Sequence, residues 1–192
     1  MIGLKYNERH IIKEIYKDVY VIDNFLSVDE TNVLINAVNT GKYTITINQS
    51  TDPTNIKNFP EKFWKPILRL SLEDNNIKAI NTLINSMFTH DIDIFRTRIS
   101  VSFIHKYKPS KLDFHVDGKE YINTIRHNIS KVIVFYLNTN NGYTEFENKE
   151  IGKVDSVINR ALIFPISLKH RAVGQTDKAE RIVMNINYTP WV

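Results

Sequence analysis

The sequence predicts an α+β domain with a β-barrel or jelly-roll core and supporting helices near its N-terminus. Two observations lead to this fold class. Apolar residues recur at helical spacing in much of the segment before residue 90, whereas from Asp91 onward they alternate with a period of two. Turn motifs then divide the second half into several short strands, a pattern typical of barrels and jelly rolls.

Length and composition indicate one ordinary globular domain. The chain has 192 residues, 42% of them hydrophobic, so we expect a single domain over 1–192. Its helical support should lie mainly in 27–90 and its β core mainly in 91–190. Because no segment resembles a secretory signal or a membrane span, we expect a cytoplasmic protein with no membrane partner. The sequence does not indicate an oligomeric state.

Charge and cysteine content exclude several kinds of site. The formal net charge of +4 is small and dispersed, which argues against nucleic acid as a partner. With no cysteine in the chain, disulfides, zinc–thiolate sites and cysteine nucleophiles are excluded. Any metal must therefore be held by His, Asp, Glu or water.

In the first half, residues 19–25 are rich in β-formers and predict a strand. Ser27 and Glu30 match a capping box, so a helix should begin there and end at Gly41. Residues 43–47 predict a short strand. Apolar spacing predicts two further helices, over 63–72 and 77–87.

In the second half, alternation predicts the strands, and Asn140-Asn141-Gly142 predicts a hairpin turn. The expected strands are 92–104, 114–117, 131–137, 143–146, 157–164, 169–173 and 181–188.

Four residues could form a metal centre with an adjacent anion site. His115 and Asp117 are two positions apart, so on an extended strand both side chains project to the same side. His170 could complete a facial triad of two imidazoles and one carboxylate, which is typical of non-haem Fe(II) oxygenases. Arg181 could bind an anionic co-substrate. Each residue taken singly is more often structural; their order, spacing and strand context together favour the metal centre.

Five motifs occur in a fixed order along the chain. They are Val21-Ile22-Asp23-Asn24-Phe25-Leu26, Tyr107-Lys108-Pro109, Val134-Phe135-Tyr136-Leu137-Asn138, Gly142-Tyr143-Thr144-Glu145-Phe146, and Leu162-Ile163-Phe164-Pro165 followed by His170 and Arg181-Ile182-Val183. Over about 19–188 they resemble the Fe(II)/2-oxoglutarate-dependent dioxygenases, and within that superfamily the prolyl 4-hydroxylase-like branch. Ser110 and Asn141 stand where that branch usually has glycine, which affects the expected loop shape rather than the ligand set.

The resemblance implies a double-stranded β-helix with His115, Asp117 and His170 as iron ligands. It implies that Arg181 pairs with the distal carboxylate of 2-oxoglutarate, and that Tyr107 and Tyr136 line the co-substrate pocket. Asn185 and Asn187 alternate with apolar residues nearby, and one of them should face this pocket.

The implied activity is hydroxylation of a C–H bond with Fe(II), 2-oxoglutarate and O₂, ascorbate serving as a reductant, and with release of succinate and CO₂. The resemblance favours proline, a prolyl peptide or another amino acid as substrate, so the partner would be a small molecule or a peptide.

Two alternatives remain open. The first is a nucleic-acid base dealkylase or hydroxylase of the same superfamily. Such enzymes usually carry a second arginine six residues after the co-substrate arginine, where this chain has Asn187. The second is a non-catalytic β-barrel binding module, against which the complete set of His115, Asp117, His170 and Arg181 argues.

Overall fold

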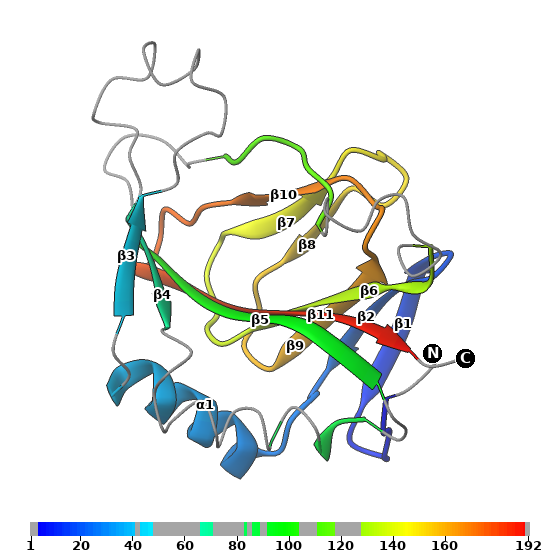
Figure 1. The fold of residues 1–192 in the computed structure, drawn as a ribbon, viewed down its shortest axis with the longest axis horizontal. Helices are drawn as coiled ribbons and strands as arrows, with labels where there is room; N and C mark the ends of the chain where they lie inside the picture. Colours follow the sequence, from blue (N-terminus) through cyan, green and yellow to red (C-terminus); the bar gives the residue numbers. More distant parts are fainter. Residues whose placement is uncertain are drawn as a thin grey trace.

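The computed structural model describes residues 4–40, 43–47, 66–70, 83, 86–88, 92–103, 111–117 and 128–190. Within them, eleven strands and one named helix form the fold shown in Figure 1. The elements are β1 (Ile11–Tyr16), β2 (Val19–Asp23), α1 (Val28–Thr40), β3 (Tyr43–Ile47), β4 (Pro66–Leu70), β5 (Ile92–Phe103), β6 (Lys131–Tyr136), β7 (Tyr143–Phe146), β8 (Lys153–Asp155), β9 (Arg160–Pro165), β10 (His170–Val173) and β11 (Glu180–Pro190).

The strands form two antiparallel sheets. The large sheet has the order β1-β2-β9-β6-β11-β5-β4-β3, and the small sheet has the order β10-β7-β8. In Figure 1 the small sheet lies over one face of the large sheet, and α1 lies on the opposite side. This is the jelly-roll arrangement of a double-stranded β-helix, as predicted, with helical support reduced to α1 among the described elements.

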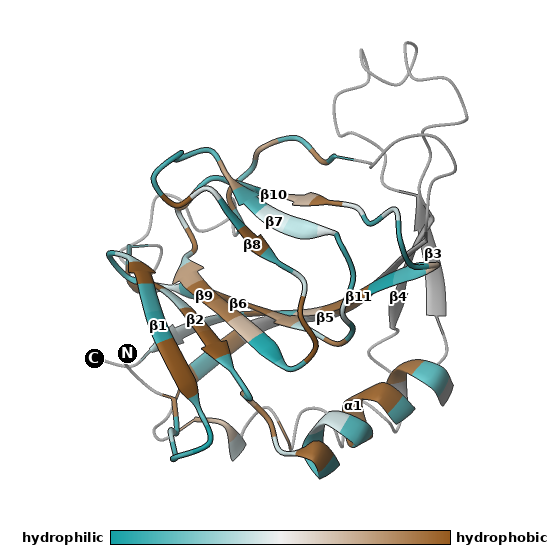
Figure 2. Cartoon of the chain, turned by 180° about the vertical axis from the view of Figure 1, so that it is seen from behind, coloured by the Kyte–Doolittle hydropathy of each residue, from teal (hydrophilic) through white to brown (hydrophobic). Residues whose placement is uncertain are grey.

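Alternation along the central strands gives the large sheet two buried faces. The outer face packs with α1, whose Leu34 and Val38 join one apolar cluster with residues of β6, β9 and β11. The inner face faces the small sheet, and its cluster includes Phe146 of β7 and Val154 of β8. Figure 2 shows hydrophobic residues along β2 and β9, two strands that contribute side chains to both clusters.

Strand β11 lies between β6 and β5 and shows this alternation most clearly. Its residues Ile182, Met184 and Ile186 pack with the outer cluster, whereas Val183 belongs to the inner cluster. Arg181, Asn185 and Asn187 share the parity of Val183 and therefore project to the inner face.

Helix α1 begins at the predicted capping box. The backbone N–H of Glu30 donates to Ser27 Oγ at 3.2 Å, and the N–H of Ser27 donates to Glu30 Oε2 at 2.7 Å. Two helix-terminal N–H groups are thereby satisfied. Partial burial acts to raise the pKa of the Glu30 carboxyl, but hydrogen bonds from Ser27 and the charge of Arg9, its ion-pair partner, outweigh burial and lower this pKa.

Three predictions from the sequence differ from the structure. The turn at Asn140-Asn141-Gly142 forms no β-hairpin, because β6 and β7 belong to different sheets. Residues 63–72 were expected to be helical, but Pro66–Leu70 is strand β4, paired with β3 and β5. A short apolar run fits either period, and sheet pairing decides between them. Strands β1 and β8 were not predicted. Residues 114–117 form no regular strand; His115 makes a single bridge to His170. The helix expected over 77–87 falls mostly outside the described residues.

The helix of the described part is not long and apolar enough to cross a membrane.

We predict that Ser27→Ala lowers the free energy of unfolding by about 1 kcal/mol, because the N–H of Glu30 loses its acceptor. The measurement is urea denaturation followed by circular dichroism. Ser27→Thr is the matched control and should lose only a few tenths of a kcal/mol, since threonine keeps a hydroxyl that can accept from the N–H of Glu30. Equal losses in the two variants would contradict a role for the Ser27 hydroxyl.

Candidate metal centre

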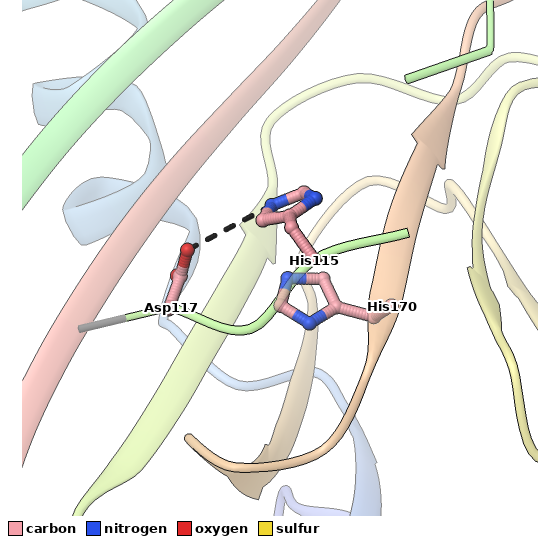
Figure 3. Close-up of side chains that lie close together, drawn as sticks. All are labelled: His115, Asp117 and His170. Atoms are coloured by element: carbon pink, nitrogen blue, oxygen red, sulfur yellow. Dashed lines mark ion pairs between the residues drawn. The ribbon is translucent and has the colours of Figure 1, made fainter. Parts of the chain in front are cut away.

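His115, Asp117 and His170 lie together although His170 is far from the other two in the sequence (Figure 3). The backbones of His115 and His170 join them: the N–H of each donates to the carbonyl of the other, at 2.9 and 3.0 Å. This antiparallel bridge places the two imidazole rings side by side, with centroids 4.7 Å apart. Asp117 follows on the same extended segment, two residues after His115.

Backbone carbonyls select the tautomer of both histidines. Nδ1 of His115 lies 2.9 Å from the carbonyl oxygen of Asp113, and Nδ1 of His170 lies 2.9 Å from that of Leu168. A carbonyl can only accept, so in each neutral ring Nδ1 bears the proton and Nε2 bears the lone pair. This is the arrangement in which histidine ligates a metal through Nε2.

The ring of His170 is also fixed by packing. Phe164 of β9 meets it edge-on with a centroid distance of 4.7 Å, and Phe146 of β7 lies 6.4 Å away. His170 is buried, whereas His115 is partly exposed. The site therefore lies at one edge of the inner cluster, with His115 on its more accessible side.

Asp117 is a buried carboxylate with little protein charge to balance it. It is 5% exposed, and its ion-pair contact among the described residues is with Nε2 of His115 at 3.8 Å. No lysine or arginine of the described part pairs with it. A buried carboxylate without a cation is strongly disfavoured. The site accordingly favours a bound cation.

The three side chains fit a divalent metal. One potential ligand atom from each lies within 4.8 Å of the others. Two imidazole nitrogens and one carboxylate oxygen form the donor set of non-haem iron sites, which retain open positions for other ligands.

Arg181 is a buried residue whose positive charge is opposite to that of Asp117. It is 3% exposed, its Nε donates to Ser156 Oγ at 3.0 Å, and its Cζ lies 5.6 Å from the ring centroid of Tyr136. No carboxylate of the described residues pairs with it. Burial lowers the pKa of the guanidinium, an effect that Tyr136 opposes. The inner face of β11 therefore holds a buried cation suited to an anionic ligand.

Glycine is required where the stem of Arg181 crosses the β6–β7 turn. A Cβ on Gly142 would lie 2.9 Å from Arg181 Cδ, 2.9 Å from the carbonyl oxygen of Val173 and 2.8 Å from Asn140 Oδ1. Carbon atoms do not approach backbone oxygen this closely, so any side chain here would displace the arginine or the turn.

Asn138 fixes the backbone on both sides of Arg181. Its Oδ1 accepts from the N–H of Ile182 at 2.9 Å, and its Nδ2 donates to the carbonyl of Glu180 at 2.9 Å. Asn140 reinforces it by donating to Asn138 Oδ1 at 3.0 Å. One side-chain amide thus fixes the strand segment that carries the buried cation.

Asn141 stands where the resemblance led us to expect glycine, and its side chain makes specific contacts. Its Nδ2 donates to Thr176 Oγ1 at 2.7 Å, and its Oδ1 accepts from the N–H of Thr176 at 2.8 Å. The turn before β7 is thereby joined to the loop before β11.

Of the two tyrosines predicted to line the co-substrate pocket, the structure describes Tyr136 but not Tyr107. Tyr136 is fully buried on the inner face, and its hydroxyl donates to Thr144 Oγ1 at 2.8 Å. Burial raises the pKa of its phenol, an effect that Arg181 opposes, so the hydroxyl is protonated at neutral pH. Tyr107 lies outside the described residues.

Of the two asparagines on β11, Asn187 is completely buried and Asn185 is partly exposed.

The sequence alone assigns no role to Ser156 or Asn138. Ser156 could not have been found, because its pairing with Arg181 depends on tertiary structure. Asn138 is the last residue of the motif that begins at Val134, and its place in that motif is the sequence signal that could have indicated its role.

Comparisons with known proteins bear on the fold. No model of a protein family matches the chain, and no curated protein matches it. Solved structures do match. A viral collagen prolyl hydroxylase from Paramecium Bursaria Chlorella virus-1, in complex with 2OG, aligns at 17% identity with a TM-score of 0.51, over 91% of this chain and 97% of that one.

Two further structures extend this similarity. A prolyl hydroxylase from Trichoplax adhaerens, in complex with a peptide of hypoxia-inducible factor, aligns at 13% identity with a TM-score of 0.55, over 90% of this chain and 84% of that one. A protein of the 2OG-Fe(II) oxygenase family from Burkholderia pseudomallei aligns at 10% identity with a TM-score of 0.61, over 99% and 95%. These similarities confirm the predicted fold.

We predict that Gly142→Ala destabilises the protein by about 1–3 kcal/mol, because its methyl group overlaps the carbonyl of Val173 and the stem of Arg181. It should also weaken binding of dicarboxylates, measured by calorimetry.

Gly152→Ala is the control. Gly152 has φ +68, but among the described residues a Cβ there approaches only the carbonyl oxygen of Lys149, at 3.8 Å. This variant should lose stability through backbone strain alone and keep its dicarboxylate affinity. Unchanged affinity in Gly142→Ala would show that the glycine does not serve the arginine.

Proposed function

We propose that this chain is an Fe(II)- and 2-oxoglutarate-dependent dioxygenase that hydroxylates a C–H bond. The observation that supports it most is that two oppositely charged side chains are buried without a charged protein partner to balance them. Asp117 lacks a cation and Arg181 lacks an anion among the described residues. A divalent metal and a dicarboxylate co-substrate would balance both charges together.

In this proposal His115 and His170 bind Fe(II) through Nε2, and Asp117 binds it through a carboxylate oxygen. The backbone carbonyls that accept from Nδ1 keep both rings oriented before the metal arrives. Phe164 and Phe146 shield His170 from solvent. When bound, the iron would supply the activation of O₂ on which the hydroxylation depends.

Arg181 would bind the distal carboxylate of 2-oxoglutarate with its planar fork, while Ser156, Gly142 and Asn138 hold the arginine in position. Tyr136 would place its protonated hydroxyl beside that carboxylate. Tyr107 stays a predicted contact of the same pocket. Burial strengthens these electrostatic interactions because water is excluded.

The overall reaction balances as follows. One O₂ accepts two electrons from the oxidative decarboxylation of 2-oxoglutarate and two from a C–H bond. One oxygen atom enters the succinate carboxylate and the other the new hydroxyl, and CO₂ is released. Ascorbate would serve as a reductant that keeps the iron in the Fe(II) state.

For the substrate we propose proline, a prolyl peptide or another amino acid. Two of the structures with this fold are prolyl hydroxylases, one of them bound to a peptide, and this supports the proposal. The partner would then be a small molecule or a peptide rather than a nucleic acid.

The experiment is an assay of succinate formation with Fe(II), 2-oxoglutarate, ascorbate and O₂, over a panel of proline, prolyl peptides, other amino acids and single-stranded DNA. We predict succinate from the wild type, and at least a 100-fold loss in His170→Ala and in Arg181→Leu, since each removes a charged or ligating contact.

Two matched variants control for general damage. His10→Ala removes another partly buried histidine, bonded to the carbonyl of Phe25. Arg171→Leu removes an arginine of β10 that is paired with Glu145 of β7. Both should retain turnover. No succinate under any condition, with no metal-dependent rise in melting temperature, would leave the non-catalytic binding module as the better account. Stimulation by DNA alone would favour the base-modifying alternative.

A further inference from the structure

Asn187 is the one described residue whose buried side-chain atoms lack every hydrogen-bond partner. It is completely buried in β11, and neither Nδ2 nor Oδ1 is bonded. Buried amides are nearly always paired, because desolvation without a replacement hydrogen bond destabilises the fold. An orphaned amide beside a functional site therefore suggests a missing ligand.

The position of Asn187 relates it to the metal centre. It shares the inner face of β11 with Arg181 and lies opposite Val132 of β6, which in turn lies opposite Phe164 of β9. The ring of Phe164 contacts the ring of His170 at 4.7 Å. Residues on one rung of a sheet project to the same side, so Asn187 shares its rung and its face with Phe164, the residue that packs on the His170 ring.

Arg181 lies near a different rung. Its neighbour on the inner face, Val183, is opposite Tyr136, whose ring the guanidinium approaches. The inner face of β11 thus runs from a buried cation at one end to an orphaned amide at the metal end. A 2-oxo dicarboxylate has the same polarity, with a distal carboxylate and an oxo-acid group that binds metal.

We propose that Asn187 binds the oxo-acid end of the co-substrate, its Nδ2 donating to the carboxylate next to the keto group. This rests on the proposed function, and it adds a contact residue to the ligands and to Arg181. The amide would be orphaned in the empty fold and satisfied in the complex, so part of the binding energy would come from relief of its desolvation.

The next inner-face position serves as a matched control. Thr189 is buried on the same strand, and its Oγ1 lies 2.8 Å from Ser130 Oγ. The Thr189 hydroxyl therefore has a hydrogen-bond partner within the protein. Replacing Thr189 with an apolar residue should lower the stability of the fold, whereas replacing Asn187 should raise it.

The test compares Asn187→Leu, Thr189→Val and Arg181→Leu, first without ligand. Leucine is close to asparagine in shape, so Asn187→Leu should raise the melting temperature, whereas Thr189→Val should lower it. A lower melting temperature for Asn187→Leu would overturn the proposal, since it would show that the amide is already satisfied.

Binding is then measured by calorimetry with Mn(II) and either N-oxalylglycine or oxalate. Asn187→Leu should weaken both by about tenfold or more. Arg181→Leu should weaken N-oxalylglycine but not oxalate, which lacks the distal carboxylate. Thr189→Val should bind both normally.

The outcomes separate the two proposals. If the wild type binds neither compound with Mn(II), the proposed function fails and this inference fails with it. If the wild type binds both and Asn187→Leu binds both equally well, only the role of Asn187 is wrong. Loss of N-oxalylglycine alone in Asn187→Leu would place its contact away from the oxo-acid end and would also overturn the proposal.

Discussion

The alternation of strand β11 is the constraint on which the site depends. β11 lies between β5 and β6 in the large sheet, so its backbone is bonded on both sides and its register is fixed. Met184 and Ile186 are buried toward α1, which forces Arg181 and Asn187 to the inner face. A slip of one residue would place the arginine in the apolar outer cluster. Packing of the outer face thus fixes the chemistry of the inner one.

The interior between the two sheets contains two buried charges, which is uncommon in an apolar protein core. Asp117 and Arg181 are both almost inaccessible, and neither has an oppositely charged protein partner in the described part of the chain. Isolated buried charges destabilise a fold unless a ligand compensates them. The contacts around them, from the Nδ1 bonds of the histidines to Asn138 and Gly142, hold the side chains in place before any ligand binds. Such preorganisation lowers the entropic cost of binding.

Much of this followed from the sequence, and the exceptions have physical causes. The capping box at Ser27, the long strand β5 and the central strands were predictable, because local pattern and burial agree there. The sequence predicts a helix over 63–72 because the four apolar residues of β4, Pro66, Ile67, Leu68 and Leu70, fit both periods, whereas pairing with β3 and β5 makes this segment a strand. The structure brings His115, Asp117 and His170 together, as their spacing and the family resemblance had led us to expect. The support that Ser156 gives to Arg181, and the unpaired state of Asn187, depend on tertiary contacts that no local pattern encodes.

A crystal structure of the protein with Mn(II) and N-oxalylglycine, with the metal located by anomalous scattering, would test the central claim most directly. The account predicts one metal ion bound by Nε2 of His115, Nε2 of His170 and a carboxylate oxygen of Asp117. It also predicts the distal carboxylate of the analogue on the guanidinium of Arg181. A metal bound elsewhere, or an analogue that leaves Arg181 without an anion, would contradict it.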